Sequence, residues 1–329
     1  DGLGDKAITS YQYEGGRYYF NDYLDKRFAG FQIVAKTDAL GNTAKQYFHQ
    51  GDETDSAFGE YSDHPAKINL MYREDVFDGN GQLQARTTNK WDQTDLGNNR
   101  NFVFNSETVK KSYDGAGAHK DSAESFEYSN LNGNLTKRTE WGEVSAQSNG
   151  AFTDVGADLR VHTYSYASNG TDIVGLPSQE IITNQAGDKI RETISYYDNL
   201  PFGAASIGNK TKDANWMVGV QYANNSRIYD SFGLIVKSYD ANNNPTTNVY
   251  DGYNLYPAAV TNALGQKVQY QYDYAVGKPK QTIDANNYIY ETSFDPIGRV
   301  KQERMPDAAA PASLAVSTEY FYTDNANPR

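Results

Sequence analysis

The sequence contains no cysteine, and only 3 Met and 3 Trp occur among its 329 residues. Without cysteine the chain has no disulfide, no thiolate zinc site and no cysteine nucleophile, which suits a protein that must survive outside a reducing compartment. It also lacks a run of 18 apolar residues, and it lacks a charged start followed by an apolar segment. We therefore expect no membrane span and no signal peptide in this sequence.

The sequence has fewer basic than acidic residues: 30 Lys and Arg and 42 Asp and Glu give a formal net charge of -12. A nucleic-acid backbone would be repelled over most of such a surface, so we exclude nucleic acid as a partner. The acidic residues are spread along the chain instead of forming blocks. This distribution predicts a solvated face.

Aromatic residues are abundant, with 27 Tyr and 14 Phe beside 28 Gly. This composition favours strands and tight turns over helices, and the low apolar share of 38% means that rings must carry much of the packing. Strict alternation supports strands independently, as where Tyr270 and Tyr272 alternate with Gln269 and Gln271. No stretch offers a capped amphipathic helix of three turns. We predict an all-β chain.

A short repeat runs through the last third of the sequence. Each unit opens with an acidic or amide residue, and each step between openers is ten or eleven residues. The openers are Asp230, Asp240, Asp251, Asn262, Asp273, Asp284 and Asp295.

Three positions after most openers stands a Gly or Asn that tolerates a positive φ, and after Asp273 the Gly comes one place later, at Gly277. An Asp or Asn side chain accepts a hydrogen bond from the backbone two residues on, and the later Gly or Asn completes the reversal. About seven residues remain between turns, roughly 23 Å of extended chain. Short turns make successive strands antiparallel, so the pattern predicts a long meander. The residues after the openers are Gly233, Asn243, Asn254, Gly265, Asn287 and Gly298.

Weaker copies of the turn occur upstream at irregular spacing. We expect residues 52–65 and 115–125 to form longer surface loops, because they are polar and contain Gly. We divide the chain into residues 1–195, with irregular repeats, and residues 196–329, with regular repeats, within one continuous β architecture. The upstream pairs are Asp38 with Gly41, Asp78 with Gly81, Asp114 with Gly117, Asn130 with Gly133, and Asn184 with Gly187.

The repeat motifs resemble the YD repeats of Rhs proteins, Tc toxin B and C components, and teneurins. The residues that carry this resemblance are Tyr229-Asp230-Ser-Phe-Gly233, Tyr239-Asp240, Tyr250-Asp251, Tyr272-Asp273 and Phe294-Asp295-Pro-Ile-Gly298-Arg299. Near the N-terminus, Lys26-Arg-Phe-Ala-Gly-Phe31, Thr37-Asp-Ala-Leu-Gly41 and Tyr47-Phe-His-Gln-Gly51 are similar to the region of Tc toxin B components and SpvB-like proteins that leads into their repeats.

The resemblance implies a curved sheet that forms part of a hollow, shell-like wall around a C-terminal toxin or effector segment, in a large bacterial protein that is secreted or lies on the cell surface. It implies as partners the rest of the same polypeptide, the enclosed toxin segment and other toxin-complex subunits. The alternative is a cell-surface adhesion or carbohydrate-binding module, with glycans as partners. The structural repeat residues are Tyr229, Asp230, Gly233, Tyr239, Asp240, Tyr250, Asp251, Tyr272, Asp273, Phe294, Asp295 and Gly298.

The sequence departs from the complete Rhs pattern. It lacks the Asp-Pro-rich closing motif that supplies self-cleaving aspartates in many Rhs cores, and Asp295-Pro296 lies inside an ordinary repeat. We do not transfer proteolysis to it. The chain opens on Asp1, and it closes while a strand-like stretch, residues 318–322, is entering its turn. We expect a piece of a longer polypeptide.

Candidate catalytic and metal sites are weak. There is no GxSxG elbow, no Glu-x-Glu pair and no phosphate loop, and the histidines lack metal-ligand spacing. The stretch from Asp240 begins like a calcium loop, but Pro245 stands where an EF-hand needs Gly, so both it and the stretch from Asp114 are interpreted as turns. We predict no enzymatic activity, no cofactor and no metal. The histidines are His49, His64, His119 and His162.

Overall fold

The computed structural model describes residues 7–52, 63–98, 100–115, 117–311 and 313–322. Across these residues the chain forms 22 strands of one antiparallel sheet, and the helical element that they contain is a single 3-10 turn, η1 (Pro65–Lys67). The predicted all-β antiparallel meander is therefore confirmed. In the described residues no helix is long and apolar enough to cross a membrane.

The chain divides into two compact units. Unit 1 comprises Asp1–Tyr166 and Val174–Thr193, and unit 2 comprises Ala167–Ile173 and Ile194–Arg329. The division into residues 1–195, with irregular repeats, and residues 196–329, with regular repeats, stays a prediction.

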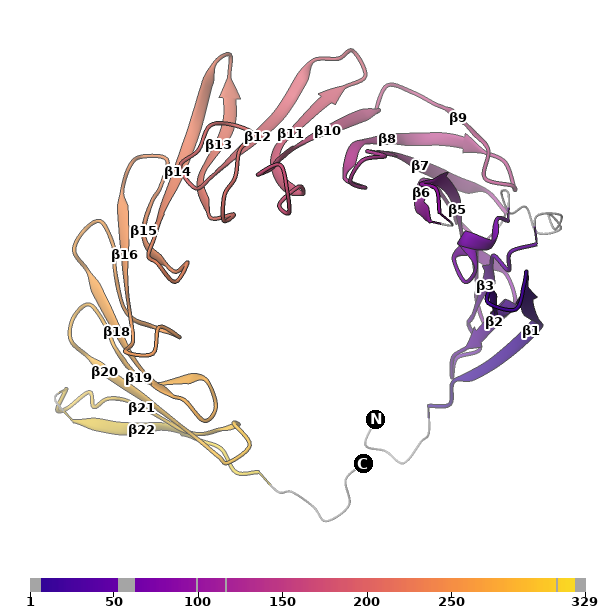
Figure 1. Cartoon of the computed structure of the whole chain (residues 1–329). Helices are drawn as coiled ribbons and strands as arrows, with labels where there is room; N and C mark the ends of the chain where they lie inside the picture. Colours follow the sequence, from indigo (N-terminus) through magenta and orange to yellow (C-terminus); the bar gives the residue numbers. More distant parts are fainter. Residues whose placement is uncertain (1–6, 53–62, 99, 116, 312, 323–329) are drawn as a thin grey trace. The chain divides into compact units, whose positions relative to one another are not determined.

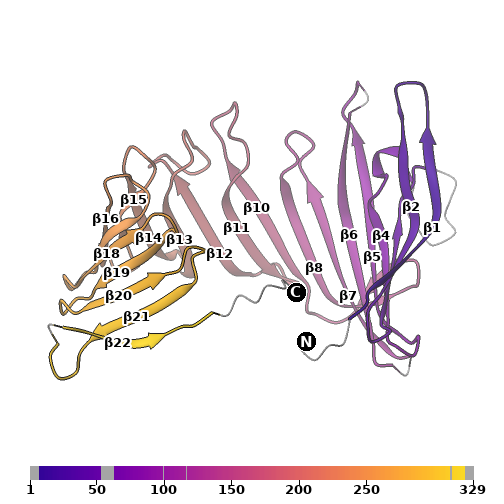
Figure 2. The same cartoon turned by 90° about the horizontal axis from the view of Figure 1, so that it is seen from below.

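The strands of unit 1 stand side by side as long hairpins (Figure 2). From β1 to β9 each strand pairs antiparallel with the next, and β10 returns to pair with β8. The strands are β1 (Ser10–Phe20), β2 (Lys26–Thr37), β3 (Thr43–Phe48), β4 (Met71–Phe77), β5 (Leu83–Asp95), β6 (Asn101–Tyr113), β7 (His119–Tyr128), β8 (Leu135–Ala146), β9 (Phe152–Asp154), β10 (Arg160–Ala167) and β11 (Leu176–Asn184). Strand β12 (Lys189–Tyr197) has residues in both units, and Ala167, the last residue of β10, belongs to unit 2.

The strands of unit 2 are shorter and follow one another as a simple meander (Figure 1). Each strand from β13 to β21 pairs antiparallel with the next one. They are β13 (Lys210–Val218), β14 (Gln221–Tyr229), β15 (Ile235–Tyr239), β16 (Pro245–Tyr250), β17 (Pro257–Thr261), β18 (Lys267–Asp273), β19 (Lys278–Ile283), β20 (Ile289–Phe294), β21 (Val300–Pro306) and β22 (Leu314–Glu319).

Strand length explains why the turns upstream are irregularly spaced. Strands β5 and β6 have 13 residues each, whereas β15 to β20 have 5 to 7. The loop expected at residues 115–125 is wrong over most of its length, because β7 begins at His119 and its alternate residues Asp121 and Ala123 are buried on one face of the sheet. Of the loop expected at residues 52–65, residues 53–62 lie outside the described residues.

The sheet is a single layer over the described residues, so most side chains contact water. The accessible area is 20217 Å², whereas a compact protein of 36.6 kDa would expose about 13,500 Å². Unit 1 contains two small apolar clusters, whereas the buried apolar residues of unit 2 are mostly alanines. Backbone ladders and cross-strand side-chain pairs must therefore supply much of the stability. The clusters are Ile33, Tyr47 and Tyr72 with Trp91, and Val109, Ala123 and Val144 with Trp141, Ala146 and Phe152.

Candidate functional site: turn edges and polar networks of the sheet

The repeat aspartates close the hairpin turns through their own carboxylates. Asp230 Oδ1 accepts the backbone N–H of Phe232 at 2.9 Å and that of Leu234 at 3.0 Å. The backbone N–H of Gly233 donates to the Asp230 carbonyl at 3.2 Å, with Gly233 at φ +79°. This is the local chemistry expected of an Asp followed three residues later by a residue with positive φ.

The other repeat openers make the same contacts. Asp240, Asp251 and Asp295 each accept two backbone N–H groups, from the residues two and four places on. Asp273 accepts the N–H of Ala275 at 3.0 Å, and its carbonyl accepts the N–H of Gly277 at 2.8 Å. The same structure recurs at Asn262 and Asp284.

Four of the five aromatic-Asp pairs between residues 229 and 295 lie at one class of turn. These four aromatic residues recur every two strands, at steps of 21 or 22 residues. Tyr229, Tyr250 and Phe294 end β14, β16 and β20, and Tyr272 is the last residue but one of β18. Tyr239 ends β15 and therefore belongs to the alternate class of turns, with Asn262 and Asp284. The structural repeat is thus a hairpin of about two sequence periods.

A β-bulge accompanies each of these four aromatic residues. The pairing register shifts between Ile228 and Tyr229, and equivalent shifts occur just before the other three. The pairs β15–β16, β17–β18 and β19–β20, which meet at the alternate turns, show no shift. Because a bulge bends a strand and increases its twist, bulges at every second turn distort each hairpin in the same sense.

Tyrosine hydroxyls bridge neighbouring strands at the bulges. Tyr229 donates to the Lys210 carbonyl at 2.9 Å, and Tyr250 donates to the Ile235 carbonyl at 3.2 Å. In both cases the acceptor is the first residue of the preceding strand. Tyr272 instead stacks on Tyr256, with ring centroids 4.5 Å apart. Tyr229 and Tyr250 therefore hold the end of their strand against the preceding strand, and the Asp that follows closes the next turn.

Two further tyrosines repeat this bridge and were missed in the sequence. Tyr166 donates to the Leu135 carbonyl at 2.7 Å, and Tyr322 donates to the Val300 carbonyl at 2.8 Å. Neither Tyr precedes an Asp directly, so the Tyr-Asp pattern passed over them. Tyr166 is the last residue but one of β10, and Tyr322 follows β22. A Tyr near the end of every second strand would therefore have been the better signal.

One turn carboxylate also binds a tyrosine from the next hairpin. Tyr274 donates its hydroxyl to Asp251 Oδ2 at 2.8 Å, and this hydrogen bond, with the nearby negative charge, raises the pKa of Tyr274 to about 12. The hydrogen bond from Leu255 lowers the pKa of Asp251, and the one from Tyr274 adds to this effect. Ionisation of the phenol is therefore disfavoured while Asp251 is charged.

A ladder of charged residues, of which Asp75, Lys111 and Asp121 are buried, crosses unit 1. Its central carboxylate, Asp75, is 1% exposed and receives Arg86 Nε at 2.7 Å and Arg73 Nε at 3.0 Å. Burial by itself would raise the pKa of Asp75, but the hydrogen bonds from the two arginines outweigh it and hold that pKa below its ordinary value. In register, one residue per strand from β3 to β7, the ladder reads Lys45, Asp75, Arg86, Lys111 and Asp121.

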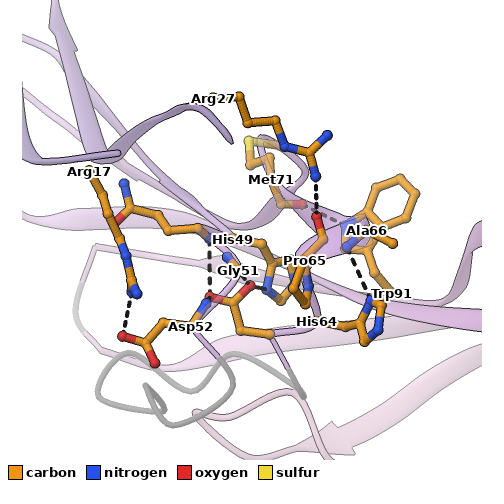
Figure 3. A network of polar contacts seen from close by, with 12 residues as sticks. Arg17, Arg27, His49, Gly51, Asp52, His64, Pro65, Ala66, Met71 and Trp91 are labelled. Carbon is orange, nitrogen blue, oxygen red and sulfur yellow. Dashed lines mark hydrogen bonds and ion pairs between the residues drawn. The ribbon is translucent and has the colours of Figure 1, made fainter. Parts of the chain in front are cut away.

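A second buried network surrounds His49, which is fully buried (Figure 3). His49 Nδ1 lies 3.0 Å from Asp63 Oδ1, and the Asp63 carboxylate also accepts the backbone N–H groups of residues 50, 51 and 52 at 3.0–3.1 Å. Burial would raise the pKa of Asp63, but the bond from His49 and those from the backbone prevail and lower it. Both residues are buried, so we interpret this His–Asp pair as a structural clamp.

The clamp is tied to the first two strands. Gln50 Nε2 donates to the carbonyls of Gly15 and Gly30, at 2.8 and 3.0 Å, and Arg17 pairs with Asp52. These residues are far apart in the sequence, and no local pattern indicated that they would meet.

The other histidines have separate partners. His64 Nδ1 accepts the Ala66 N–H and caps η1, His119 pairs with Asp121, and His162 lies between Glu140 and Glu180. Within the described ranges no three His, Asp or Glu residues are grouped so as to hold a metal ion. The stretch at Asp240 is a turn, since its carboxylate accepts two backbone N–H groups and the Asn244 amide.

These features define a class of protein: a single-layer antiparallel meander whose hairpins are closed by Asp turns and locked by aromatic residues. No protein-family model matches the sequence, and comparison with curated proteins gives no match.

Several solved structures have a fold similar to that of this chain. The crystal structure of TcdB2–TccC3–TEV matches 91% of this chain with a TM-score of 0.70 at 14% identity. TcdB2–TccC3 without its hypervariable C-terminal region matches the same share with a TM-score of 0.69 at 14% identity, and the Tc holotoxin pore of Photorhabdus luminescens does so at 13%. The chain spans only 21% of the length of each of these chains. The resemblance inferred from the sequence is thus confirmed at the level of the fold.

Proposed function

We propose that this chain is a non-enzymatic structural segment of a YD-repeat shell, which encapsulates a C-terminal toxin or effector polypeptide within a large secreted or cell-surface bacterial protein. The observation that carries the proposal is the fold, a single-layer meander that matches TcdB2–TccC3 over 91% of the chain with a TM-score of 0.70. The twelve repeat residues have a structural role in this proposal: they close and lock the hairpins.

The chemistry of the sheet suits a wall better than a catalytic surface. On unit 2 a groove of about 690 Å³ crosses β18 to β22, and its lining is dominated by amide and charged side chains. Register places Gln281 opposite Gln271 and Glu291, and Glu291 opposite Arg304. Such a surface offers hydrogen bonds to a polypeptide backbone but little apolar area against which a cargo could fold.

The partners follow from this role. The remainder of the same polypeptide would continue the wall, and other toxin-complex subunits would join it. One matched structure is TcdB2–TccC3 without a hypervariable C-terminal region. We propose a segment of that kind as the enclosed cargo.

Single-particle electron microscopy of the full-length protein that contains this chain tests the proposal. We expect a hollow shell with weak internal density, and we expect that density to disappear when the segment after the repeats is deleted. A solid rod or a flat sheet would reject encapsulation and make adhesion at a cell surface the better account.

A further inference from the structure

A polar groove of about 980 Å³ lies on unit 1, where two hairpin ends and η1 meet. The ends of the β1–β2 and β5–β6 hairpins lie along the same edge of the unit (Figure 2). Residues His64, Pro65 and Ala66 line the groove together with these hairpin ends. The volume is at the upper end of the range of about 300–1,000 Å³ that is usual for ligand pockets.

The first hairpin presents one face of its strand ends to the groove. Tyr19 and Arg27 are register partners, and Asn21 and Asp25 continue the same alternation into the turn. The Arg27 guanidinium lies 5.7 Å from the centre of the Tyr19 ring, and Arg27 also donates to the Pro65 carbonyl at 2.9 Å (Figure 3). The ring is thereby oriented by a side chain that is itself held at η1.

The second hairpin presents its strand ends in the same way. Gln93 pairs with Val103 and Asp95 pairs with Asn101, so these four side chains share a face, and Asn98 lies in the turn beyond them. In the described structure the amides of Gln93, Asn98 and Asn101 make no side-chain hydrogen bond. Each amide keeps one acceptor and two donors available.

We propose that this groove binds a neutral oligosaccharide. Sugar hydroxyls both donate and accept, as do the three amides, and the apolar face of a pyranose ring can stack on the Tyr19 ring. His64 adds a donor, because its Nδ1 accepts the Ala66 N–H at 3.1 Å and its proton therefore lies on Nε2.

Charge and polarity decide against other ligand classes. Two carboxylates, Asp25 and Asp95, oppose the single guanidinium of Arg27 in the lining, and the chain carries a net charge of -12. Phosphates and polyanionic glycans would be repelled. An extended peptide with apolar side chains would find few apolar residues in the lining, chiefly Val103, Pro65 and Ala66.

The site is tested by isothermal titration of the full chain with cellotetraose, maltotetraose, chitotetraose, 6′-sialyllactose and an unstructured Ser/Asn peptide. We expect at least one neutral oligosaccharide to bind with a Kd of roughly 0.1–1 mM, the weak end of the affinity scale. Stronger binding of sialyllactose or of the peptide, or no binding by any neutral sugar, would overturn the proposal.

Three variants locate the site. Tyr19→Ala should weaken binding about tenfold, comparable with the loss of an aromatic stacking partner elsewhere. Asn98→Gly should weaken it about threefold, because it removes an amide while tolerating the positive φ of 54°. Tyr11→Ala, an exposed ring at the other end of β1, should leave the Kd unchanged.

Equal losses in Tyr19→Ala and Tyr11→Ala, at unchanged thermal stability, would place the sugar elsewhere and reject the groove. The titration measures only the binding of sugar to this chain. Its outcome therefore does not depend on whether electron microscopy finds a hollow shell.

Discussion

At the scale of the residue, Tyr229 and Tyr250 contribute a hydrogen bond between strands in addition to the packing of their rings. Tyr229 ends its strand at a bulge, and its hydroxyl donates to a backbone carbonyl that begins the preceding strand. The Asp fixes the turn within one hairpin, whereas the Tyr fixes the turn against its neighbouring strand. At Tyr229-Asp230 and Tyr250-Asp251 the two residues of the pair thus stabilise different connections.

We predict that Tyr229→Phe lowers the free energy of unfolding by about 1 kcal/mol, the usual net contribution of one hydrogen bond. The ring and its packing remain, so only the bond to the Lys210 carbonyl is lost. Urea unfolding followed by circular dichroism measures the change. Tyr253→Phe is the matched control, because Tyr253 is 71% exposed in a turn and its hydroxyl makes no hydrogen bond in the described structure; equal effects would contradict the bridging role.

The charged ladder of unit 1 also depends on single residues. Asp75→Asn should lower the free energy of unfolding by about 3 kcal/mol, because it removes the carboxylate that pairs with the partly buried Arg73 and Arg86. Trp91 lies beside the neighbouring apolar cluster and reports unfolding by fluorescence.

The control for this substitution is Glu143→Gln. Glu143 pairs with Lys120 at the surface, where both side chains are at least half exposed. Its loss should change the free energy of unfolding by no more than about 0.5 kcal/mol. If Asp75→Asn were as mild as this control, the ladder would not contribute to stability.

At the scale of the element, local features were predictable from the sequence and long-range ones were not. The turns at Asp230 and Asp251 follow from hydrogen bonds between residues two to four apart, so their sequence pattern contains their geometry. By contrast, His49 and Asp63 are 14 residues apart, and no pattern in the sequence links them.

The candidate groove was invisible in the sequence for the same reason. Tyr19 and Asn98 belong to hairpins separated by two further strands, and only the folded sheet and η1 bring their ends together. The upstream turn assigned to Asn130 shows a smaller error of this kind. The turn opens one residue earlier, at Ser129, whose carbonyl accepts the Gly133 N–H at 2.9 Å. Ser129 and Asn130 are adjacent polar residues, and the sequence alone did not show which of them makes this bond.

The networks predict how the sheet responds to acid. Asp63 and Asp75 have pKa values held below the ordinary value of 3.8 by hydrogen bonds that outweigh their burial. In unit 2 the same holds for Asp213, which pairs with Lys210 and Arg227. A carboxyl with a lowered folded-state pKa stabilises the fold fully above its unfolded-state pKa, and this stability is lost as pH falls through the folded-state value.

We therefore expect the urea midpoint to be steady from pH 7 to about 5 and to fall below about pH 4, near the unfolded-state pKa of Asp. Asp75→Asn should flatten part of this fall, since one of the titrating groups is removed. A midpoint that rises on acidification below pH 4 would show that the signs of these pKa shifts are wrong.

At the scale of the whole molecule, burial is unevenly distributed along the chain. Both apolar clusters and the charged ladder lie in unit 1. Within unit 2 the last buried apolar residue is Ala259, and no described residue from β18 to β22 is buried. In a sheet where each strand contacts mainly its neighbours, stability is close to a sum of local terms, as in repeat proteins.

Hydrogen–deuterium exchange of the full chain should therefore show a gradient. Backbone amides of β4 to β7 should exchange slowest, and those of β18 to β22 should exchange fastest, since segments with few buried contacts open at the lowest free energy. Tyr229→Phe should speed exchange in β13 and β14 and leave β4 to β7 unchanged, because nearest-neighbour coupling fades along the meander. Uniform protection in all strands, or a variant that speeds exchange everywhere, would instead show that the two units unfold as one cooperative body, and the wall would then owe its rigidity to global coupling instead of to the locks in each hairpin.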